Sequence, residues 1–420
     1  METDNIVIRA LLNMRSAISS LSFKKDKKTV IVGAWFGEKF ADNSRFLFQY
    51  LSENKSKLGL EHVIWVTADE QLANDLREYG YEAVVMGSEE SEKWHKRAYY
   101  HIICNASSKQ ALRDKNGNVH IINGDIETEL SFRARRINLW HGTGGLKAVN
   151  MATNAYKKRK SAHPVQYAVK EFLLFHSKVY PLFFLYNGGW GRCYQITTSP
   201  LQTETIHQTW ARPKKMCIET GYPRNCECPR LLKHEAQIIN IMNEYRAVVL
   251  YLPTFRSNSS YEYLDLSTIY YDTLREHDIL WIEKSHSAEK VYVSNHSIDP
   301  NVIKLNPNFD INVLIPHITI LLTDYSSVRM DAMFHNKATL FYVPDYDEYL
   351  HGDNGFMADP NEVLCGPKYK NIGELREGIV KFSYDPEASK TSNYQTIRER
   401  YWSKDRTLDD IWADIISVVG

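Results

Sequence analysis

Short apolar runs alternate along most of the chain with segments whose apolar positions lie three and four residues apart. The runs predict buried strands, and the spaced segments predict amphipathic helices. In the first half the strand-like runs are 28–37, 62–67, 81–87, 101–107, 136–142, 194–199 and 215–221. In the second half they are 247–256, 278–286, 301–305, 318–327 and 338–345. Strands that alternate with helices form parallel sheets covered by helices, so the pattern indicates an α/β fold.

The alternation is interrupted once, between residues 151 and 190, and three amphipathic segments end the chain. A chain of 420 residues is long enough for two or three domains, each with its own core. We therefore predict two Rossmann-like domains that face each other across a cleft, at 1–243 and 244–420. The first would carry the insert 151–190, and the second would carry the closing helices. In such sheets ligands bind beyond the carboxyl ends of the strands, so the candidate chemistry is expected there.

The composition is that of an ordinary globular protein, with 43% hydrophobic and 24% charged residues. The 51 Lys and Arg balance the 51 Asp and Glu, so no net field attracts nucleic acid and no nucleic-acid partner is expected. The six cysteines are scattered without zinc spacing and indicate free thiols. The first residues are too polar for an export signal, and no apolar run reaches the roughly 18 residues of a membrane span. We expect a cytoplasmic protein, or one bound at the inner face of the cell membrane.

His141 and the glycines after it end one of the strand-like runs of the first half. A histidine at a strand end can act as a general base near neutral pH, and Gly142 lets a substrate approach the backbone closely. The alternative is a core histidine beside a tight turn. These residues alone leave both interpretations open.

Two strand ends in the second half carry cationic side chains. Arg256 follows Thr254 after the first of these strands, and its planar fork of donors suits phosphate. Lys284 and His286 alternate along the next strand, so both are expected to point to the same side. Two cationic donors on one side of a strand end suit a diphosphate, although any one of these residues alone is more often structural.

The segment 321–334 places Asp324, Ser326 and Ser327 between a strand end and a helical pattern. Ser326 or Ser327 is a natural N-cap, and Asp324 also favours a helix start. The free amides of that helix start also form an anion site, which the hydroxyls would extend, so capping and phosphate binding are compatible. The sequence contains no P-loop and no convincing metal cluster. No metal is therefore expected, and Arg and Lys would supply the positive charge.

Several sequence segments occur in a characteristic order: GEKFADNSRFLFQYL, LWHGTGGLKAV, TGYPRN, LYLPTFR, EKSH, LLTDYSSVRMDAMF, ATLFYVPDYDEY and NGFMADPNEVLCGP. In this order they resemble the CDP-glycerol glycerophosphotransferase family, the teichoic-acid-type and capsule polyol-phosphate transferases. The resemblance covers roughly residues 28–418, and the order of several motifs is far more specific than any one of them. It implies a GT-B fold. It also implies transfer of glycerol phosphate from CDP-glycerol to a hydroxyl, with release of CMP.

The resemblance implies roles for individual residues. His141 would be the base that deprotonates the acceptor hydroxyl. His286, as a second catalytic residue, would stabilise the departing CMP together with Arg256 and Lys284. The residues expected to contact substrate are Gly142, Thr143, Arg224, Thr254, Arg256, Lys284, Asp324, Ser326, Ser327 and Asp331. The expected partners are CDP-glycerol and a lipid-linked or oligosaccharide acceptor, and no cofactor is expected.

The chain departs from the family pattern near three of these motifs. Gly144 and Gly145 stand where the family usually has proline. Ser287 stands in place of a further proline, and Asn354 in place of an arginine. These departures leave the polyol and the acceptor open, so a ribitol-phosphate transferase is an alternative. A GT-B glycosyltransferase that uses a nucleotide sugar and a catalytically silent scaffold are two others.

The insert has two interpretations. The basic run 157–160 precedes an aromatic, leucine-rich stretch, so 157–190 would lie on the cytoplasmic leaflet near a lipid-linked acceptor. Alternatively, the insert is an internal helix pair with solvated lysines, which Pro181 and the short length of the stretch favour. Membrane contact is therefore a hypothesis.

Overall fold

The computed structural model describes residues 18, 21–105, 110–113, 119–122, 124–127, 130, 133–142, 146–175, 193–254, 266, 270–284, 299–351 and 355–420. The chain forms two compact units. The first unit contains Met1–His141, His163–Pro229 and Lys404–Gly420, and the second contains Gly142–Ala162 and Arg230–Ser403. This division assigns the segments 142–162, 230–243 and 404–420 differently from the predicted boundary at residue 243.

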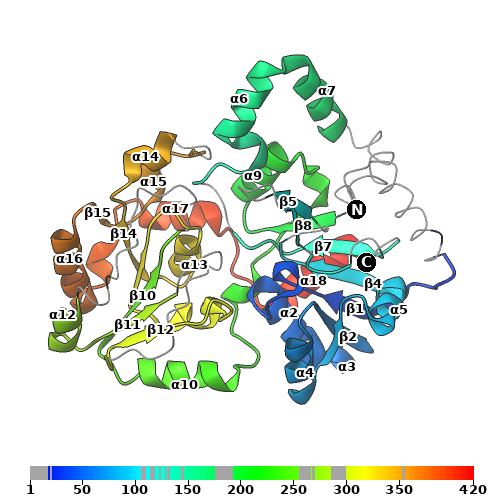
Figure 1. The fold of residues 1–420 in the computed structure, drawn as a ribbon, viewed down its shortest axis with the longest axis horizontal. Coiled ribbons are helices and arrows are strands. Elements are labelled where there is room, and N and C mark those ends of the chain that lie inside the picture. The colour runs from blue at the N-terminus through cyan, green and yellow to red at the C-terminus, as the bar shows by residue number, and fades with distance from the viewer. Residues whose placement is uncertain are drawn as a thin grey trace. The chain divides into compact units, whose positions relative to one another are not determined.

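The first unit is built on a seven-stranded sheet in the order β3-β2-β1-β4-β7-β8-β9, in which every neighbouring pair is parallel (Figure 1). Its strands are β1 (Asp26–Val32), β2 (His62–Thr67), β3 (Glu82–Val85), β4 (Ala98–Ile103), β7 (Arg135–Asn138), β8 (Cys193–Thr197) and β9 (Cys217–Glu219). The helices that connect them include α2 (Asp42–Glu53), α3 (Lys55–Leu58), α4 (Glu70–Glu78), α5 (Glu89–Arg97) and α9 (Pro200–Trp210). The strand order reverses between β1 and β4, which makes the crevice beyond these two strands the switch point of the sheet.

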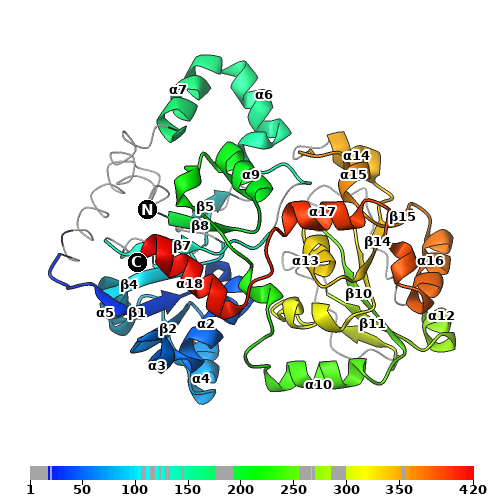
Figure 2. The same ribbon diagram turned by 180° about the vertical axis from the view of Figure 1, so that it is seen from behind.

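The last helix of the chain, α18 (Leu408–Val419), packs on this first sheet, as Figure 2 shows from behind. The ring of Trp412 meets the ring of Tyr100 on β4 edge-on, with the centroids 5.6 Å apart. The hydroxyl of Thr220 donates to the carboxylate of Asp414 at 2.7 Å. The chain therefore returns to the first unit after the second unit is complete.

The second unit has a six-stranded sheet in the order β12-β11-β10-β13-β14-β15, again parallel throughout. Its strands are β10 (Ala247–Leu252), β11 (Ile279–Glu283), β12 (Val302–Lys304), β13 (Ile320–Thr323), β14 (Ala338–Tyr342) and β15 (Lys368–Tyr369). Its helices include α10 (Lys233–Met242), α12 (Tyr271–Glu276), α13 (Val328–Phe334), α14 (Tyr346–His351), α15 (Pro360–Val363), α16 (Ile372–Tyr384) and α17 (Tyr394–Tyr401). Here the strand order reverses between β10 and β13.

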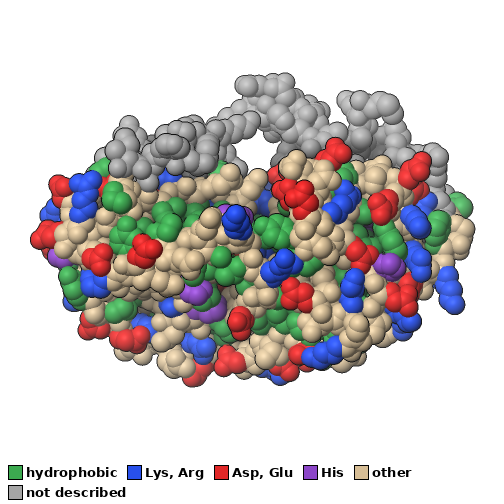
Figure 3. All heavy atoms as spheres, turned by 90° about the horizontal axis from the view of Figure 1, so that it is seen from below, with side chains coloured by type: hydrophobic (Ala, Val, Ile, Leu, Met, Phe, Trp, Pro, Cys, Tyr) green, Lys and Arg blue, Asp and Glu red, His purple; other side chains and the backbone are tan. Residues whose placement is uncertain are grey.

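The described part of the insert forms two helices with exposed side chains, α6 (Asn154–Ala162) and α7 (Pro164–Phe175). The basic residues 157–160 of α6 are all exposed, and so are Val165, Val169 and Phe172 on α7. The exposed basic residues fit both interpretations of the insert, whereas the exposed Val165, Val169 and Phe172 do not fit an internal helix. Residues 176–190, most of the leucine-rich stretch, lie outside the described residues. Elsewhere, acidic and basic side chains are interspersed on the face drawn in Figure 3. Within the described ranges, no helix has the length and apolar character needed to cross a membrane.

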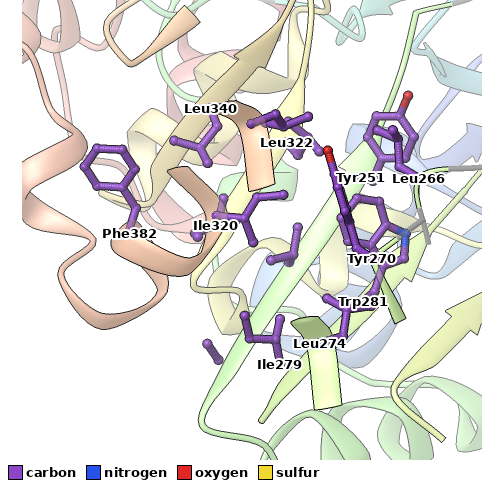
Figure 4. Close-up of a cluster of buried hydrophobic side chains, with 14 of the residues drawn as sticks. Tyr251, Leu266, Tyr270, Leu274, Ile279, Trp281, Ile320, Leu322, Leu340 and Phe382 are labelled. Carbon is purple, nitrogen blue, oxygen red and sulfur yellow. The ribbon is translucent and has the colours of Figure 1, made fainter. Parts of the chain in front are cut away.

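The core of the second unit explains why its strands could be recognised in the sequence (Figure 4). All six residues of β10 are buried, as expected for a strand covered on both faces. Trp281 on β11 is fully buried against Tyr251 and Tyr270, and its indole N–H donates to the carboxylate of Glu283 at 2.8 Å. A buried aromatic ring with a satisfied polar atom stabilises the fold, by about 2–3 kcal/mol for a large apolar side chain.

The predicted α/β class, with two Rossmann-like units and closing helices, is confirmed. Strand β4 begins at Ala98, three residues before the predicted run, because α5 ends at Arg97. An antiparallel hairpin of β5 (Gln110–Arg113) and β6 (Val119–Ile122) was not predicted. Its strands have four residues each, which is too short for a clear periodic signal.

Candidate functional site

His141 follows the carboxyl end of β7, and the turn before it is strained. Trp140 has φ +59°, in the left-handed region that bulky residues rarely adopt. Its amide donates to the side chain of Asn138 at 2.7 Å, and its carbonyl accepts from the Nδ2 of Asn43 at 2.8 Å. The same Nδ2 donates to the carbonyl of Leu139 at 3.2 Å. Asn43, near the start of α2, thus holds the turn that presents His141.

Further strained residues belong to segments next to this turn. Trp35, Phe36 and Asp42 also have positive φ, at 43°, 63° and 66°. The ring of His141 contacts two tryptophans, with centroid distances of 5.2 Å to Trp35 and 4.3 Å to Trp140. Positive φ at non-glycine residues costs about 1–3 kcal/mol each and is typical of functional sites. The local backbone is therefore built to position this imidazole.

The hydrogen bond of His141 fixes which ring nitrogen is available. Its Nδ1 lies 3.1 Å from the carbonyl of Cys104, which can only accept, so Nδ1 carries the proton. In the neutral ring Nε2 then has the free lone pair. Burial lowers the pKa of His141 below its usual value of 6.5, the carboxylate of Asp42 acts in the opposite direction, and the guanidinium of Arg224 lowers it further. The neutral, basic form is therefore favoured at pH 7.

The carbonyl that accepts from His141 belongs to a segment held by Asp125, a fully buried carboxylate. One oxygen of Asp125 accepts from the amide of Phe36 at 2.9 Å. The other accepts from the amides of Cys104 and Asn105, at 2.9 and 2.6 Å. Asp125 thereby joins the segments that follow β1 and β4 at the switch point of the first sheet. A Cβ on Gly33 would lie 2.0 Å from the backbone oxygen of Asp125, so only glycine fits there.

Arg224, predicted to contact substrate, is buried in the first unit and is 3% exposed. Its guanidinium forms an ion pair with the carboxylate of Asp42 at 2.6 Å, and its backbone amide donates to the side chain of Asn43 at 3.1 Å. These contacts attach the turn at 223–225 to the start of α2. In this arrangement Arg224 influences His141 through its charge and through Asn43.

In the second unit, Thr254 and Asp324 meet beyond the carboxyl ends of β10 and β13. The amide of Thr254 donates to one oxygen of Asp324 at 2.9 Å, and its hydroxyl donates to the other. These strands flank the reversal of strand order, where ligands of such sheets bind. The structure therefore brings these two predicted residues together at the expected edge.

Ser326 and Ser327 follow Asp324 and are both half-buried. Ser327 occupies the N-cap position of α13, as predicted for Ser326 or Ser327, but its side chain makes no capping hydrogen bond. It lies instead close to Gly142, where a Cβ would come within 3.1 Å of its Oγ. Asp331, further along α13, is buried and 2% exposed.

The remaining predicted residues are only partly described. The ammonium of Lys284 donates to the carbonyl of Phe309 at 2.7 Å, which holds it beside the end of β11. Thr143, Arg256 and His286 lie outside the described residues, so their predicted roles stay predictions.

Three residues near the site were given no role in the sequence analysis: Asn43, Asp125 and Lys147. Asn43 and Lys147 lie within motifs that carried the family resemblance, which was the signal available for them. Asp125 had no signal, because its partners are backbone amides of segments distant in the sequence. Lys147 donates from Nζ to the hydroxyl of Thr254 at 3.1 Å.

Comparison with known proteins places this arrangement in a family. The family model for CDP-glycerol:poly(glycerophosphate) glycerophosphotransferase matches residues 15–407. The chain belongs to this family. The predicted family and enzyme class of this glycerophosphotransferase are thereby confirmed, and the family description gives the donor as CDP-glycerol.

Individual relatives agree with this assignment. The chain is 25% identical over 391 residues to a teichoic acid poly(glycerol phosphate) polymerase of Bacillus spizizenii, covering 88% of each chain. It is 23% identical over 411 residues to a teichoic acid glycerol-phosphate transferase of Staphylococcus aureus, covering 93% of this chain and 92% of that one. A structure of the wall teichoic acid polymerase TagF with CDPG has a TM-score of 0.67 at 18% identity, covering 98% of this chain and 94% of that one. This structural likeness shows a shared fold.

Among the described residues, no group of three or more His, Cys, Asp and Glu side chains is placed to hold a metal ion. The polar side chains at the ends of β10 and β13 are the hydroxyl of Thr254 and the carboxylate of Asp324, with the ammonium of Lys147 bonded to that hydroxyl.

Proposed function

We propose that this glycerophosphotransferase transfers glycerol phosphate from CDP-glycerol to a hydroxyl of a lipid-linked or growing surface polysaccharide. His141 takes the proton of the acceptor hydroxyl on Nε2. The acceptor oxygen forms a bond to the β-phosphorus, the bond from that phosphorus to the bridging oxygen breaks, and CMP leaves with that oxygen. The observation that carries the proposal is the Nδ1 contact of His141 to the Cys104 carbonyl, which leaves Nε2 basic.

The donor is proposed to bind at the carboxyl edge of the second sheet. Ser326 and Ser327 would donate to its phosphates next to Thr254, whose amide and hydroxyl both donate to Asp324, and Asp331 would hold a donor hydroxyl. Arg256, Lys284 and His286 would stabilise the charge that develops on departing CMP. Phosphoryl transfer depends mainly on positioning and electrostatic stabilisation, which such groups supply.

Two alternatives use the same fold. A ribitol-phosphate transferase would release CMP from CDP-ribitol, and a nucleotide-sugar glycosyltransferase would release a nucleoside diphosphate. The test is nucleotide release from CDP-glycerol, CDP-ribitol and UDP-sugars, each with lipid-linked and oligosaccharide acceptors. Acceptor-dependent CMP release from CDP-glycerol supports the proposal. Release from CDP-ribitol alone, or of a nucleoside diphosphate alone, would replace it with the matching alternative.

No cofactor is included in this proposal, because cationic and hydroxyl side chains are assigned to the phosphates. We expect transfer to continue, within about a factor of two, after dialysis against EDTA, a change of less than 1 kcal/mol in the barrier. Loss of transfer in EDTA that returns on adding Mg²⁺ would contradict this part of the proposal.

We also propose that the insert contacts a membrane surface at the inner face of the cell membrane, near a lipid-linked acceptor. The exposed basic residues 157–160 on α6 and the exposed Val165, Val169 and Phe172 on α7 support it. Cosedimentation with anionic vesicles should fall when the four basic residues are replaced by Gln. The exchange of Lys214 and Lys215, which are also exposed, for Gln serves as a control. Equal binding by both variants and the native protein would exclude the basic run as the contact.

A further inference from the structure

Lys147 places its ammonium group at the switch point of the second sheet. Its Nζ donates to the hydroxyl of Thr254 at 3.1 Å, and that hydroxyl donates to Asp324. Because a hydroxyl can donate one bond and accept another, the three groups form an ordered chain from ammonium to carboxylate. Thr254 follows β10 and Asp324 follows β13, so the ammonium lies at the edge where ligands of such sheets bind.

The backbone around Lys147 is fixed to the second unit. Lys147 forms an isolated antiparallel bridge with Phe356, the amide of Ala148 donates to the carbonyl of Gly355 at 3.0 Å, and the amide of Met357 donates to Leu146 at 2.7 Å. Leu146 is 1% exposed, in a cluster with Tyr325, Phe341, Val343, Val363 and Leu364. The position of Lys147 is thus set by a buried anchor and a short ladder, not by the lysine side chain itself.

The side chain of Lys147 also lies beside an aromatic cluster. Its Nζ lies 5.7 Å from the centroid of the Tyr349 ring, a distance at which a cation is attracted to the ring face. Tyr349 stacks on Tyr325, with centroids 4.2 Å apart, and on Phe356, at 5.5 Å, and these two rings also contact each other. The side chain is therefore preorganised, which lowers the entropy lost when a ligand binds it.

We propose that Lys147 binds the phosphates of the CDP-linked donor, an assignment that rests on the proposed function. The ammonium is a compact positive charge at this edge of the sheet, and a charged donor forms a strong hydrogen bond to a phosphate oxygen. Asp324 orients the Thr254 hydroxyl and thereby the lysine. In the reaction the same charge stabilises the negative charge that develops on departing CMP.

Lys147→Met is the informative change, because it removes the charge and keeps an apolar stem against Tyr349. Calorimetric titration with CDP-glycerol, CDP, CMP and cytidine separates a phosphate contact from a structural role. We expect the affinity for CDP-glycerol and CDP to fall about 10- to 100-fold, with a smaller loss for CMP and no loss for cytidine. Lys147→Arg should restore part of the CDP affinity. Lys381→Met, at an exposed lysine of α16 in the same unit, is the matched control and should bind like the native protein.

The outcomes separate this assignment from the proposed function. If the native protein binds CDP-glycerol and Lys147→Met binds CDP and CDP-glycerol equally well, Lys147 is not a phosphate ligand. A loss of the same size for CDP and CMP, or unchanged steepness of the salt dependence of CDP-glycerol affinity, would likewise overturn the assignment. If the native protein binds neither CDP-glycerol nor CDP, the proposed function fails and the assignment fails with it.

Discussion

Six strands of the first sheet follow the same order as the six strands of the second, but the crevices at the two switch points contain different groups. In the first unit the crevice between β1 and β4 contains the fully buried carboxylate of Asp125, which is bonded to three backbone amides. In the second unit the crevice between β10 and β13 contains the half-buried Thr254 and the carboxylate of Asp324, with the ammonium of Lys147 beside them.

This difference indicates that the two crevices have different roles. Backbone amides bonded to Asp125 cannot exchange partners without moving β1 or β4, so this crevice is a fixed support for the Cys104 carbonyl and His141. Side-chain hydroxyl and ammonium groups can turn toward a ligand without moving a strand. The first crevice therefore serves as a scaffold for the proposed base, and the second remains available to the proposed donor.

The largest expected effect comes from exchanging the carboxylate in each crevice for its amide. In Asp125→Asn an NH₂ group would face backbone N–H donors, so we expect the free energy of unfolding to fall by about 3 kcal/mol in urea denaturation. In Asp324→Asn we expect the free energy of unfolding to fall by about 1 kcal/mol, because Thr254, which donates to this carboxylate, can readjust. We also expect a weaker affinity for CDP-glycerol.

The matched pair is informative because both carboxylates are at least 96% buried and both substitutions are isosteric. Equal losses of stability, with no difference in CDP-glycerol affinity between the two variants, would show that the crevices do not differ in role.

A smaller effect is expected at Asn43, which holds the strained turn before His141. Asn43→Ala removes two bonds to carbonyls and one from the Arg224 amide, so we expect kcat to fall about 10-fold with little change in KM for CDP-glycerol. Asn54→Ala, in which the lost side-chain bond is to the carbonyl of Tyr50 at the end of the same helix, is the control. A change in KM alone would place Asn43 in donor binding instead.

The smallest effect is a displacement of the pH profile. Burial lowers the pKa of His141 below 6.5, so its neutral form dominates at pH 7, and kcat/KM should decline only as the pH falls through that lowered value. The acid limb measured for CMP release should therefore have an apparent pKa under 6.5. In Asp42→Asn the limb should move to still lower pH, because that carboxylate raises the pKa of His141. An acid limb above 6.5 in the native protein would contradict the described environment of this histidine.

The sequence was sufficient for most of the fold because many of the strands contain a buried apolar run. β2 and β10 lie within predicted runs, and each follows the expected alternation with helices. The hairpin of β5 and β6 was not predicted, since strands of four residues are too short to show a clear period. The exposed apolar side chains of α7 were also not predicted, because the sequence of an apolar segment does not show whether it is buried in a core or exposed at the surface.

The positions of site residues were predictable only where a reactive or polar side chain follows a strand directly in the sequence. His141, Thr254 and Asp324 lie where strand ends placed them. Asp125 was not predictable, because a carboxylate bonded to backbone amides leaves no pattern in the residue types of its partners. The N-cap position of Ser327 was predicted from the sequence, but its side chain lies next to Gly142 and makes no capping hydrogen bond, which the residue type alone does not show.

The most direct test of the account compares native protein with His141→Ala in two measurements on the same samples, acceptor-dependent CMP release and affinity for CDP-glycerol. We predict that turnover falls about 10²- to 10⁴-fold, the range for loss of a general base, while the affinity stays within about twofold. Turnover that survives the substitution would contradict the role of His141 as the base. A parallel loss of CDP-glycerol affinity would contradict the assignment of donor binding to the second unit.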